Sequence, residues 1–275
     1  MKVDAGIGHQ LEKIPSIVNK LEADGYDGVR TAEMNHDPFF PLLLAAEHSD
    51  KLEIASSIAV AFARSPMNLA NIGHDLNAYS KGRFTLGLGS QIKPHITKRF
   101  SMQWGAPAAQ MRELVLAMRA IWANWYDGTP LEFVGEYYRH TLMTPAFTPE
   151  DKDFGAPKVV LAAVGPKMTE VAGEVADGMI IHPFSTLPYI NSVTLPAIEQ
   201  GLAKAGKTRE DFELSYSCFL VTGRDEAEFA ASKKAAQERI AFYGSTPAYK
   251  GAFDSIGVRD LQSELNTMSH QGRWK

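Results

Sequence analysis

Short apolar runs alternate along the chain with longer stretches in which apolar residues recur every three or four positions. The first example joins Val3–Gly8, a short run ending in glycine, to a stretch with apolar residues at Leu11, Ile14, Val18 and Leu21. The short run has the length and composition of a β-strand, and the longer spacing is that of one face of an α-helix. The pattern therefore predicts a strand followed by a helix.

The same unit recurs through most of the sequence. The predicted strands are Val3–Gly8, Tyr26–Thr31, Leu52–Ala61, Arg83–Leu88, Lys158–Val164, Asp177–His182 and Asp211–Thr222. The predicted helices that follow them cover residues 11–23, 39–47, 66–79, 107–125, 166–176, 187–204 and 225–243, the last as an amphipathic helix. Repeated strand–helix units indicate a parallel sheet, either doubly wound or closed into an eight-fold barrel.

Two stretches interrupt this rhythm. Residues 127–157 form an insertion between strands four and five, in which EFVGEYYRHTLM predicts a β-hairpin with a Gly-Glu turn. After Gly244 the pattern predicts only loop and helix, so an eighth strand is missing. We expect one domain over residues 1–275 whose C-terminal end is incomplete.

Composition and charge narrow the function classes. Of the 275 residues 45% are hydrophobic and 22% charged, and the net charge of −4 with no basic run disfavours a nucleic-acid partner. No apolar run approaches the roughly 20 residues that span a bilayer. The single cysteine, Cys218, falls in the seventh predicted strand, where we expect it to be buried, and it is typical of a reducing compartment. We therefore expect a cytoplasmic protein with no membrane association.

Polar residues cluster where the predicted strands end. The fourth strand runs through Gly87 and Gly89 into Ser90 and Gln91, so positions without side chains precede a polar loop. In a parallel barrel such strand ends build the binding mouth. Lys93, His95, Lys98, Arg99 and, in the hairpin, Arg139 add positive charge, which suits an anionic group but is also typical of a solvated face.

The second strand ends in Glu33, Met34, Asn35, His36 and Asp37. Histidine titrates near neutrality, so His36 with Glu33 nearby could exchange a proton with a substrate. The alternative is that Asp37 caps the next helix and His36 is an ordinary loop residue. The residues alone do not decide between them.

The fifth strand passes directly into a helix through Ala163, Val164, Gly165 and Pro166, with Met168 in the first turn. A helix N-terminus offers unpaired N–H groups and the positive end of the helix dipole, which together suit a phosphate. Gly165 permits close approach, and Pro166 stands where a missing N–H costs nothing. A plain strand–helix turn is the alternative.

Five segments, in order, carry a resemblance to a known family. They are SSIAVAFARSP, GRFTLGLGSQ, GEYYRHTLMTP, LAAVGPKMTEVAGEVADGMIIHP and FYGSTPAY, and they cover most of residues 1–250. Together they resemble the luciferase-like monooxygenases, a family of flavin- and deazaflavin-dependent oxidoreductases. The similarity is greatest to the branch that uses coenzyme F420.

The resemblance implies a (β/α)8 TIM barrel with an insertion region, here lacking strand eight and the last helix. It implies a cis peptide bond at Ser57–Ile58 against the cofactor ring. It also implies cofactor contacts from the fourth strand end (Gly87, Gly89, Ser90, Gln91) and a phosphate held by residues 163–166 and 168. The sugar-phosphate dehydrogenases of the family have a histidine directly after the acid and a glutamate after the second glycine. Met34 and Ser90 stand there in this chain, which argues against that activity.

These observations favour an F420-dependent oxidoreductase that transfers a hydride between the deazaflavin and a small organic substrate. His36 and Glu33 are the candidate catalytic residues, and His182 and Tyr138 the candidate substrate contacts. One alternative is an FMN-dependent monooxygenase that needs oxygen and a flavin reductase; another is a non-catalytic cofactor-binding barrel. No spacing of His, Cys or Asp suggests a metal. We expect a homodimer.

Overall fold

The computed structural model describes residues 1–273. Its contacts group into two compact units, Met1–Ala162 with Val175–Gly178, and Ala163–Glu174 with Met179–Lys275. The sequence pattern predicts one domain. The first unit carries the insertion and most of the parallel sheet, and the second carries the last strands and the C-terminal helices.

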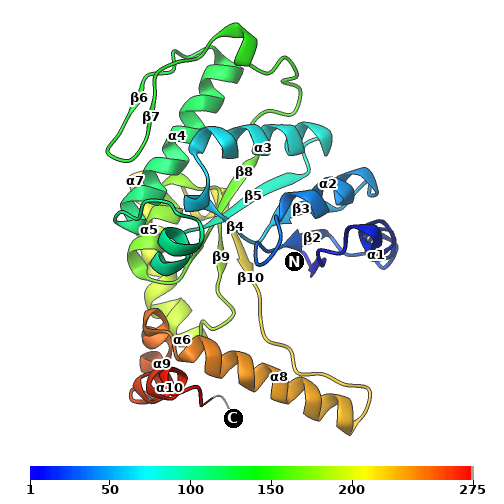
Figure 1. Ribbon diagram of the computed structural model, residues 1–275, viewed down its shortest axis with the longest axis vertical. Helices are drawn as coiled ribbons and strands as arrows, with labels where there is room; N and C mark the ends of the chain where they lie inside the picture. The colour runs from blue at the N-terminus through cyan, green and yellow to red at the C-terminus, as the bar shows by residue number, and fades with distance from the viewer. Residues whose placement is uncertain (274–275) are drawn as a thin grey trace. The chain divides into compact units, whose positions relative to one another are not determined.

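The sheet of the first unit is parallel and follows chain order, β1-β2-β3-β5-β8, with β4 paired to β5 (Figure 1). Its strands are β1 (Asp4–Gly6), β2 (Gly28–Thr31), β3 (Glu53–Ser56), β4 (Ala59–Val60), β5 (Phe84–Gly89) and β8 (Lys158–Ala163). Neighbouring strands that run parallel and in chain order need crossover connections, which the intervening helices provide. The predicted strand–helix alternation is thus confirmed for this unit.

The helices of the first unit begin and end close to the predicted positions. They are α1 (Ile14–Ala23), α2 (Phe39–Glu47), α3 (Pro66–Tyr79) and α4 (Pro107–Asp127), with shorter turns η1 (Leu11–Lys13), η2 (Ala61–Ala63), η3 (His95–Arg99) and η4 (Pro145–Phe147). Helix α3 starts where Ser65 accepts a hydrogen bond from the Asn68 N–H, 3.2 Å away, so the side chain satisfies one unpaired helix donor. Gly25 follows α1 with φ of +85°, a conformation that favours glycine.

The third predicted strand is divided in two. β3 ends at Ser56, the Ser57–Ile58 peptide bond is cis, and the chain resumes as β4 at Ala59. This confirms the bond that the family resemblance implies.

The insertion holds the predicted hairpin, built from β6 (Phe133–Val134) and β7 (Arg139–His140). One carboxylate on α4 anchors its turn: Glu113 accepts hydrogen bonds from the N–H groups of Glu136, Tyr137 and Tyr138 at 2.6–2.9 Å. Gly135 stands against that carboxylate so closely that an added Cβ would lie 2.2 Å from Oε1.

The second unit continues the alternation with α5 (Pro166–Val175), β9 (Gly178–Ile181), α6 (Leu187–Tyr189), η5 (Ile190–Thr194), α7 (Leu195–Lys204), η6 (Arg209–Asp211) and β10 (Glu213–Tyr216). β9 and β10 are neighbouring strands. α5 and α7 touch through glycines: a Cβ at Gly201 would lie 2.0 Å from the Glu170 carbonyl oxygen, and one at Gly173 would lie 2.5 Å from that of Ile198.

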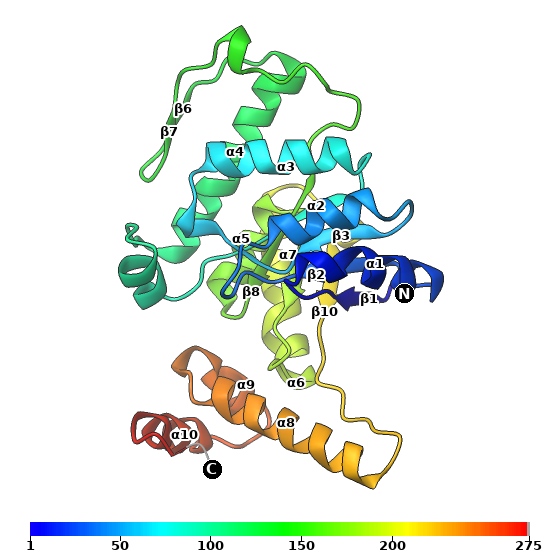
Figure 2. The same cartoon turned by 45° about the vertical axis from the view of Figure 1, so that its right-hand side comes forward.

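Helices fill the rest of the described chain. α8 (Glu226–Gly244), η7 (Pro247–Tyr249), α9 (Lys250–Ser255) and α10 (Leu261–His270) follow, and α8, α9 and α10 gather beside one another (Figure 2). No eighth strand occurs between residues 217 and 273, in agreement with the prediction of loop and helix there; residues 274 and 275 lie outside the described chain.

Three predictions for this unit are wrong. The seventh strand ends at Tyr216 instead of Thr222, and Cys218 is exposed, because the alternating residues after Tyr216 have no neighbouring strand to cover them. Helix α8 is not amphipathic, since only Ala236 and Gly244 along it are buried. It is nevertheless capped as predicted, with Asp225 accepting from the Glu228 N–H at 2.8 Å.

Candidate functional site

The parallel strands of the first unit bring several predicted residues to their C-terminal ends, the edge at which barrel enzymes carry their active sites. Glu33, which follows β2, is only 7% exposed. Its Oε2 accepts a hydrogen bond from the Val60 N–H at 2.7 Å and from Arg64 Nη1 at 2.6 Å. A carboxylate occupied in this way holds the end of β2 against β4, so the structure gives Glu33 a positioning role.

Arg64 also holds the other end of the same loop. Its Nη2 lies 2.9 Å from Asp37 Oδ2, and its guanidinium carbon lies 5.2 Å from the centre of the Phe39 ring. Asp37 Oδ1 accepts a hydrogen bond from the Phe39 N–H at 2.8 Å. This is the contact expected if Asp37 caps the helix that follows. Clamped at Glu33 and Asp37, the loop between them presents an exposed His36.

A second histidine, which the sequence reasoning missed, stands next to His36. His9 follows β1, and its ring centre lies 5.3 Å from that of His36, with 30° between the ring planes. Position after the first strand was the signal that could have found it. The structure thus brings together two imidazoles where the sequence singled out one.

Around β5 the predicted cofactor contacts divide into two kinds. Ser56 Oγ donates to the Gly87 carbonyl at 2.8 Å and accepts its N–H at 2.9 Å, which fixes β3 to β5. An added Cβ at Gly89 would lie 2.9 Å from the Ile58 side chain. A side chain at position 89 would therefore clash with Ile58, which packs over Gly89. A ligand at this strand end would contact the Ile58 side chain and not the Gly89 backbone.

Ser90 and Gln91 form a tight local turn. The Ser90 hydroxyl donates to the Gln91 carbonyl at 3.1 Å, and Gln91 adopts a left-handed φ of +58° while its Oε1 accepts the Ile92 N–H at 3.3 Å. Both polar side chains are half-buried and used within the turn.

The cations that follow β5 are exposed. Arg99 reaches back to the β2 loop, where its Nη2 donates to the Met34 carbonyl at 2.5 Å, and its guanidinium lies over the Phe100 ring at 4.8 Å. It therefore supports the loop that carries His36. Lys93 and Lys98 extend into solvent.

The turn from β8 into α5 has the features of an anion cradle. A Cβ added at Gly165 would meet nothing within 4 Å, so the space before the helix is open. The Thr169 hydroxyl, in the first turns of α5, is fully buried and has no hydrogen-bond partner among the described residues.

A tyrosine holds this turn in place. Tyr189 donates its phenolic hydrogen to the Val164 carbonyl at 3.1 Å, and burial raises the pKa of Tyr189. Gly251 makes room for the ring, since a Cβ there would lie 2.8 Å from Tyr189. Ala163 is buried below the turn, and Val164 and Met168 are half-buried around it.

The two predicted substrate contacts are engaged elsewhere. His182 stacks on Tyr249 and meets Tyr243 edge-on, both at 4.6 Å between ring centres, and its Nδ1 accepts the Phe184 N–H at 3.2 Å. Burial lowers the pKa of His182 to about 4, so the ring is neutral with its hydrogen on Nε2. The Tyr138 hydroxyl accepts from Gln110 Nε2 on α4 at 3.3 Å, and burial raises the pKa of Tyr138.

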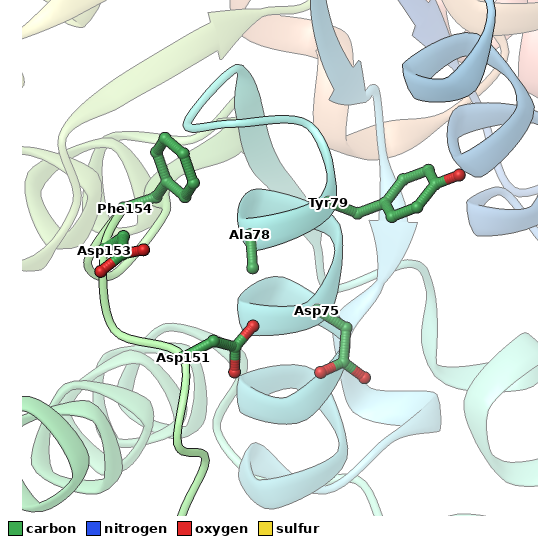
Figure 3. A pocket seen from close by; sticks show the side chains of 6 residues that line it. All are labelled: Asp75, Ala78, Tyr79, Asp151, Asp153 and Phe154. Carbon is green, nitrogen blue, oxygen red and sulfur yellow. The ribbon is translucent and has the colours of Figure 1, made fainter.

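A cavity of about 300 Å³ lies elsewhere in the first unit, lined by Asp75, Ala78, Tyr79, Asp151, Asp153 and Phe154 (Figure 3). Beside it, His74 bridges Tyr126 and Asp151, at 2.6 and 3.1 Å. The cavity borders the last turns of α3, which lead to the N-terminal end of β5. In a barrel, residues at the N-terminal ends of the strands contribute to stability, and the active site lies at the opposite ends.

No group of three or more His, Cys, Asp or Glu side chains within residues 1–273 has the geometry of a metal site. Over the same range, every helix is too short or too polar to cross a membrane.

Comparison with known proteins agrees with this arrangement. A family description, the luciferase-like monooxygenases, matches residues 3–274. The chain belongs to the luciferase-like monooxygenase family. An uncharacterised protein of Mycobacterium tuberculosis is 53% identical over 275 residues, which cover 100% of this chain and 81% of that protein. The 5,10-methylenetetrahydromethanopterin reductase of Archaeoglobus fulgidus is 27% identical over 87% of this chain and 69% of its own.

The fold is that of the family's TIM barrels. The coenzyme F420-dependent tetrahydromethanopterin reductase from Methanopyrus kandleri superposes with a TM-score of 0.77 at 20% identity, covering 100% of this chain and 80% of that one. The chain therefore has the barrel fold of this oxidoreductase family. The described residues include the first seven of its predicted strands, the last of which is β10.

Proposed function

We propose that this protein is a coenzyme F420-dependent oxidoreductase acting on a small organic substrate. The observation that carries the proposal is the turn into α5, where an open glycine precedes a helix N-terminus and a buried hydroxyl lacks a partner. A phosphate group fits these features, because N–H donors, the helix dipole and a hydroxyl all favour an anion. The family membership and the F420 dependence of the Methanopyrus reductase support the deazaflavin.

In the second unit, Gly165 leaves room for the phosphate, and the buried Thr169 hydroxyl is a donor without a partner among the described residues. Within the first unit, the Ile58 side chain packs over Gly89. When bound, the deazaflavin supplies hydride chemistry at its C5.

The chain also supplies a proton-exchanging group. His36 is exposed on a loop that Arg64 clamps at both ends, and a clamped loop presents its side chain in a fixed place. An imidazole there can give a proton to a substrate oxygen or take one from it.

The test replaces Gly165 by alanine. The new Cβ meets no protein atom within 4 Å and the backbone is not left-handed, so Gly165→Ala should fold as the wild-type protein does. It should nevertheless weaken F420 binding roughly tenfold or more, because the methyl group occupies space that the phosphate needs. Gly6→Ala is the matched control: its Cβ also meets open space, but no helix begins there.

Binding is followed by F420 fluorescence, and folding by circular dichroism. Equal F420 affinity of Gly165→Ala and wild type would contradict the phosphate cradle. Tight binding of FMN with no binding of F420 would instead identify an FMN-dependent monooxygenase. Binding of F420 without any turnover over a broad substrate screen would favour the non-catalytic barrel.

A further inference from the structure

Three aromatic rings from segments far apart in the sequence meet in the second unit. His182 follows β9, Tyr243 lies at the end of α8, and Tyr249 ends η7. His182 stacks on Tyr249 with 22° between the ring planes and meets Tyr243 edge-on, both at 4.6 Å between ring centres. The two tyrosine rings lie 6.0 Å apart at 90°. These three side chains, the ring cluster, have no role in the cofactor site described above.

Each ring of the ring cluster carries a polar atom without a partner. Because Nδ1 of His182 accepts the Phe184 N–H at 3.2 Å, the ring hydrogen of the neutral imidazole is on Nε2. Neither this N–H nor the hydroxyls of Tyr243 and Tyr249 bond to any atom of residues 1–273, and none of the three is a fully buried atom. The ring cluster therefore offers three hydrogen-bond donors to a molecule outside the chain.

Other tyrosines of the same unit use their hydroxyls within the protein. Tyr189 donates to the Val164 carbonyl at 3.1 Å, and Tyr216 donates to the Ser185 carbonyl at 3.0 Å. A packed tyrosine usually finds such a partner for its hydroxyl. Tyr249 is half-buried, yet its hydroxyl has none among the described residues. This difference separates the ring cluster from the structural tyrosines around it.

Apolar packing fixes the ring cluster in place. The Phe184 ring lies 5.5 Å from that of Tyr249 and 5.1 Å from that of Phe253 on α9. Phe253 in turn lies against Gly244 at the end of α8, where an added Cβ would lie 2.8 Å from its ring. The glycine therefore lets α8 and α9 approach closely. A surface that is already ordered loses less conformational freedom when it binds a ligand.

The ring cluster and the turn into α5 share a support within the second unit. Gly251 on α9 lies against the ring of Tyr189, whose hydroxyl holds the Val164 carbonyl in that turn. Phe253, two residues further along α9, packs beside the ring cluster. His182 also lies just past the C-terminal end of β9, and barrel enzymes bind their substrates at this end of the strands.

The ring cluster carries no charge that could pair with a charged ligand. Burial lowers the pKa of His182 to about 4 and raises the pKa of Tyr249 to about 12, so both are neutral at pH 7. Lys250, the next cation along the chain, pairs with Asp254 at 2.6 Å. No ion pair or cation–ring contact involves the ring cluster within residues 1–273. An uncharged ligand suits this surface, because a charged one would lose water without gaining a counter-charge.

We propose that the ring cluster binds the substrate, and that the substrate is an uncharged planar ring compound whose oxygen accepts a hydrogen bond from His182 Nε2. The proposal rests on the F420-dependent function above. Ligand sites are mostly apolar with a few polar groups that fix orientation, and aromatic side chains pack well against planar rings. In this role His182, Tyr243 and Tyr249 hold the substrate and take no part in hydride or proton transfer.

The first experiment measures binding to the wild-type protein by equilibrium dialysis, with and without F420. The probes are three naphthalenes of similar size: 2-acetylnaphthalene has an acceptor oxygen and no charge, 2-ethylnaphthalene lacks the oxygen, and 2-naphthoate is an anion. 2-Acetylnaphthalene should bind about three- to tenfold more tightly than 2-ethylnaphthalene, which corresponds to one hydrogen bond, and more tightly than 2-naphthoate. No binding of 2-acetylnaphthalene under either condition, equal affinity for 2-ethylnaphthalene, or a preference for 2-naphthoate would overturn the proposal.

The second experiment locates the site with variants. His182→Phe keeps a ring and removes the donor, so it should abolish the preference for 2-acetylnaphthalene over 2-ethylnaphthalene. Tyr249→Phe should reduce 2-acetylnaphthalene binding by a smaller factor. Tyr216→Phe is the matched control, because its hydroxyl is already bonded to the Ser185 carbonyl, and its preference should equal that of wild type. A preference that persists in folded His182→Phe would overturn the role of His182.

A third measurement needs no variant. In wild-type protein labelled with ¹⁵N-histidine, 2-acetylnaphthalene should shift the Nε2 resonance of His182 and leave that of His48, at the end of α2, unchanged. An unshifted His182 resonance at saturating ligand would contradict the hydrogen bond. This readout decides the question even if His182→Phe does not fold.

Failure of the proposal and failure of the proposed function are distinguishable. Wild-type protein that binds F420 but not 2-acetylnaphthalene contradicts the ring cluster as the substrate site and leaves the function intact. Wild-type protein that binds 2-acetylnaphthalene through His182 but does not bind F420 contradicts the function, and it makes the ring cluster a ligand site of a different activity.

Discussion

Replacing Thr169 by valine should have opposite effects on the stability of the free protein and on cofactor binding. The Thr169 side chain is 0% exposed and its hydroxyl has no hydrogen-bond partner within residues 1–273. A buried hydroxyl without a partner costs about 1–3 kcal/mol, and valine has nearly the same shape. Thr169→Val should therefore raise the free energy of unfolding of the free protein by about 1–2 kcal/mol.

Cofactor binding should weaken in the same variant. A hydrogen bond from a hydroxyl to a charged phosphate contributes about 1.5–3 kcal/mol, because one partner is ionised. Its loss corresponds to a Kd for F420 about 10- to 100-fold higher. Stabilisation of the free protein together with weaker binding is the signature of a residue retained for a ligand.

Urea unfolding followed by circular dichroism measures the first effect, and F420 fluorescence titration the second. Thr169→Ser is the control, since it keeps the hydroxyl and loses only a methyl group: it should bind F420 nearly as wild type does and be less stable. The reasoning is refuted if Thr169→Val binds F420 as tightly as wild type, or if it is destabilised by more than about 1 kcal/mol.

Three further predictions concern the supports of the site. Arg64→Met leaves Glu33 buried without its cation and should destabilise the protein by about 3 kcal/mol, whereas Glu33→Gln should cost less. Equal free energies of unfolding for the two variants would contradict the ion pair. Gly201→Ala would place a Cβ 2.0 Å from the Glu170 carbonyl oxygen, so it should lower the free energy of unfolding by about 3 kcal/mol or more. The control Gly165→Ala, whose Cβ meets no atom within 4 Å, should melt at the same temperature as the wild-type protein. Burial lowers the pKa of His182 to about 4, so between pH 7 and pH 5 the unfolded chain binds a proton that the folded chain does not. The free energy of unfolding should therefore fall by about 1–2 kcal/mol from pH 7 to pH 5, after discounting for the partial exposure of the ring. Urea unfolding at both pH values should show a weaker pH dependence for His182→Gln.

The alternation of strands and helices was predictable because the inner strands β2, β3, β5, β8 and β9 are mostly buried, and helices such as α1 and α7 bury one face. The prediction failed where a neighbour was needed to complete the pattern. Residues 217–222 alternate like a strand, yet the strand ends at Tyr216 because no other strand pairs with them, and Cys218 is exposed for the same reason. The alternation of apolar and polar residues does not show whether a neighbouring strand is present to pair with the segment.

The candidate site was predictable in place but only partly in role. Glu33, His36 and Gly165 were expected at strand ends and lie there. That Glu33 is held by Arg64, and that Gly89 accommodates Ile58, depends on side chains about 30 residues apart in sequence. His9 and Thr169 carry no motif, and their interest comes from unpaired nitrogen and oxygen atoms that only packing reveals.

The central claim is that this barrel uses a deazaflavin, and the most direct measurement titrates the purified wild-type protein with coenzyme F420 and with FMN in parallel. We expect micromolar binding of F420 and much weaker binding of FMN, with the F420 affinity reduced in Gly165→Ala. Preferential binding of FMN, or an affinity for F420 that Gly165→Ala leaves unchanged, would contradict it.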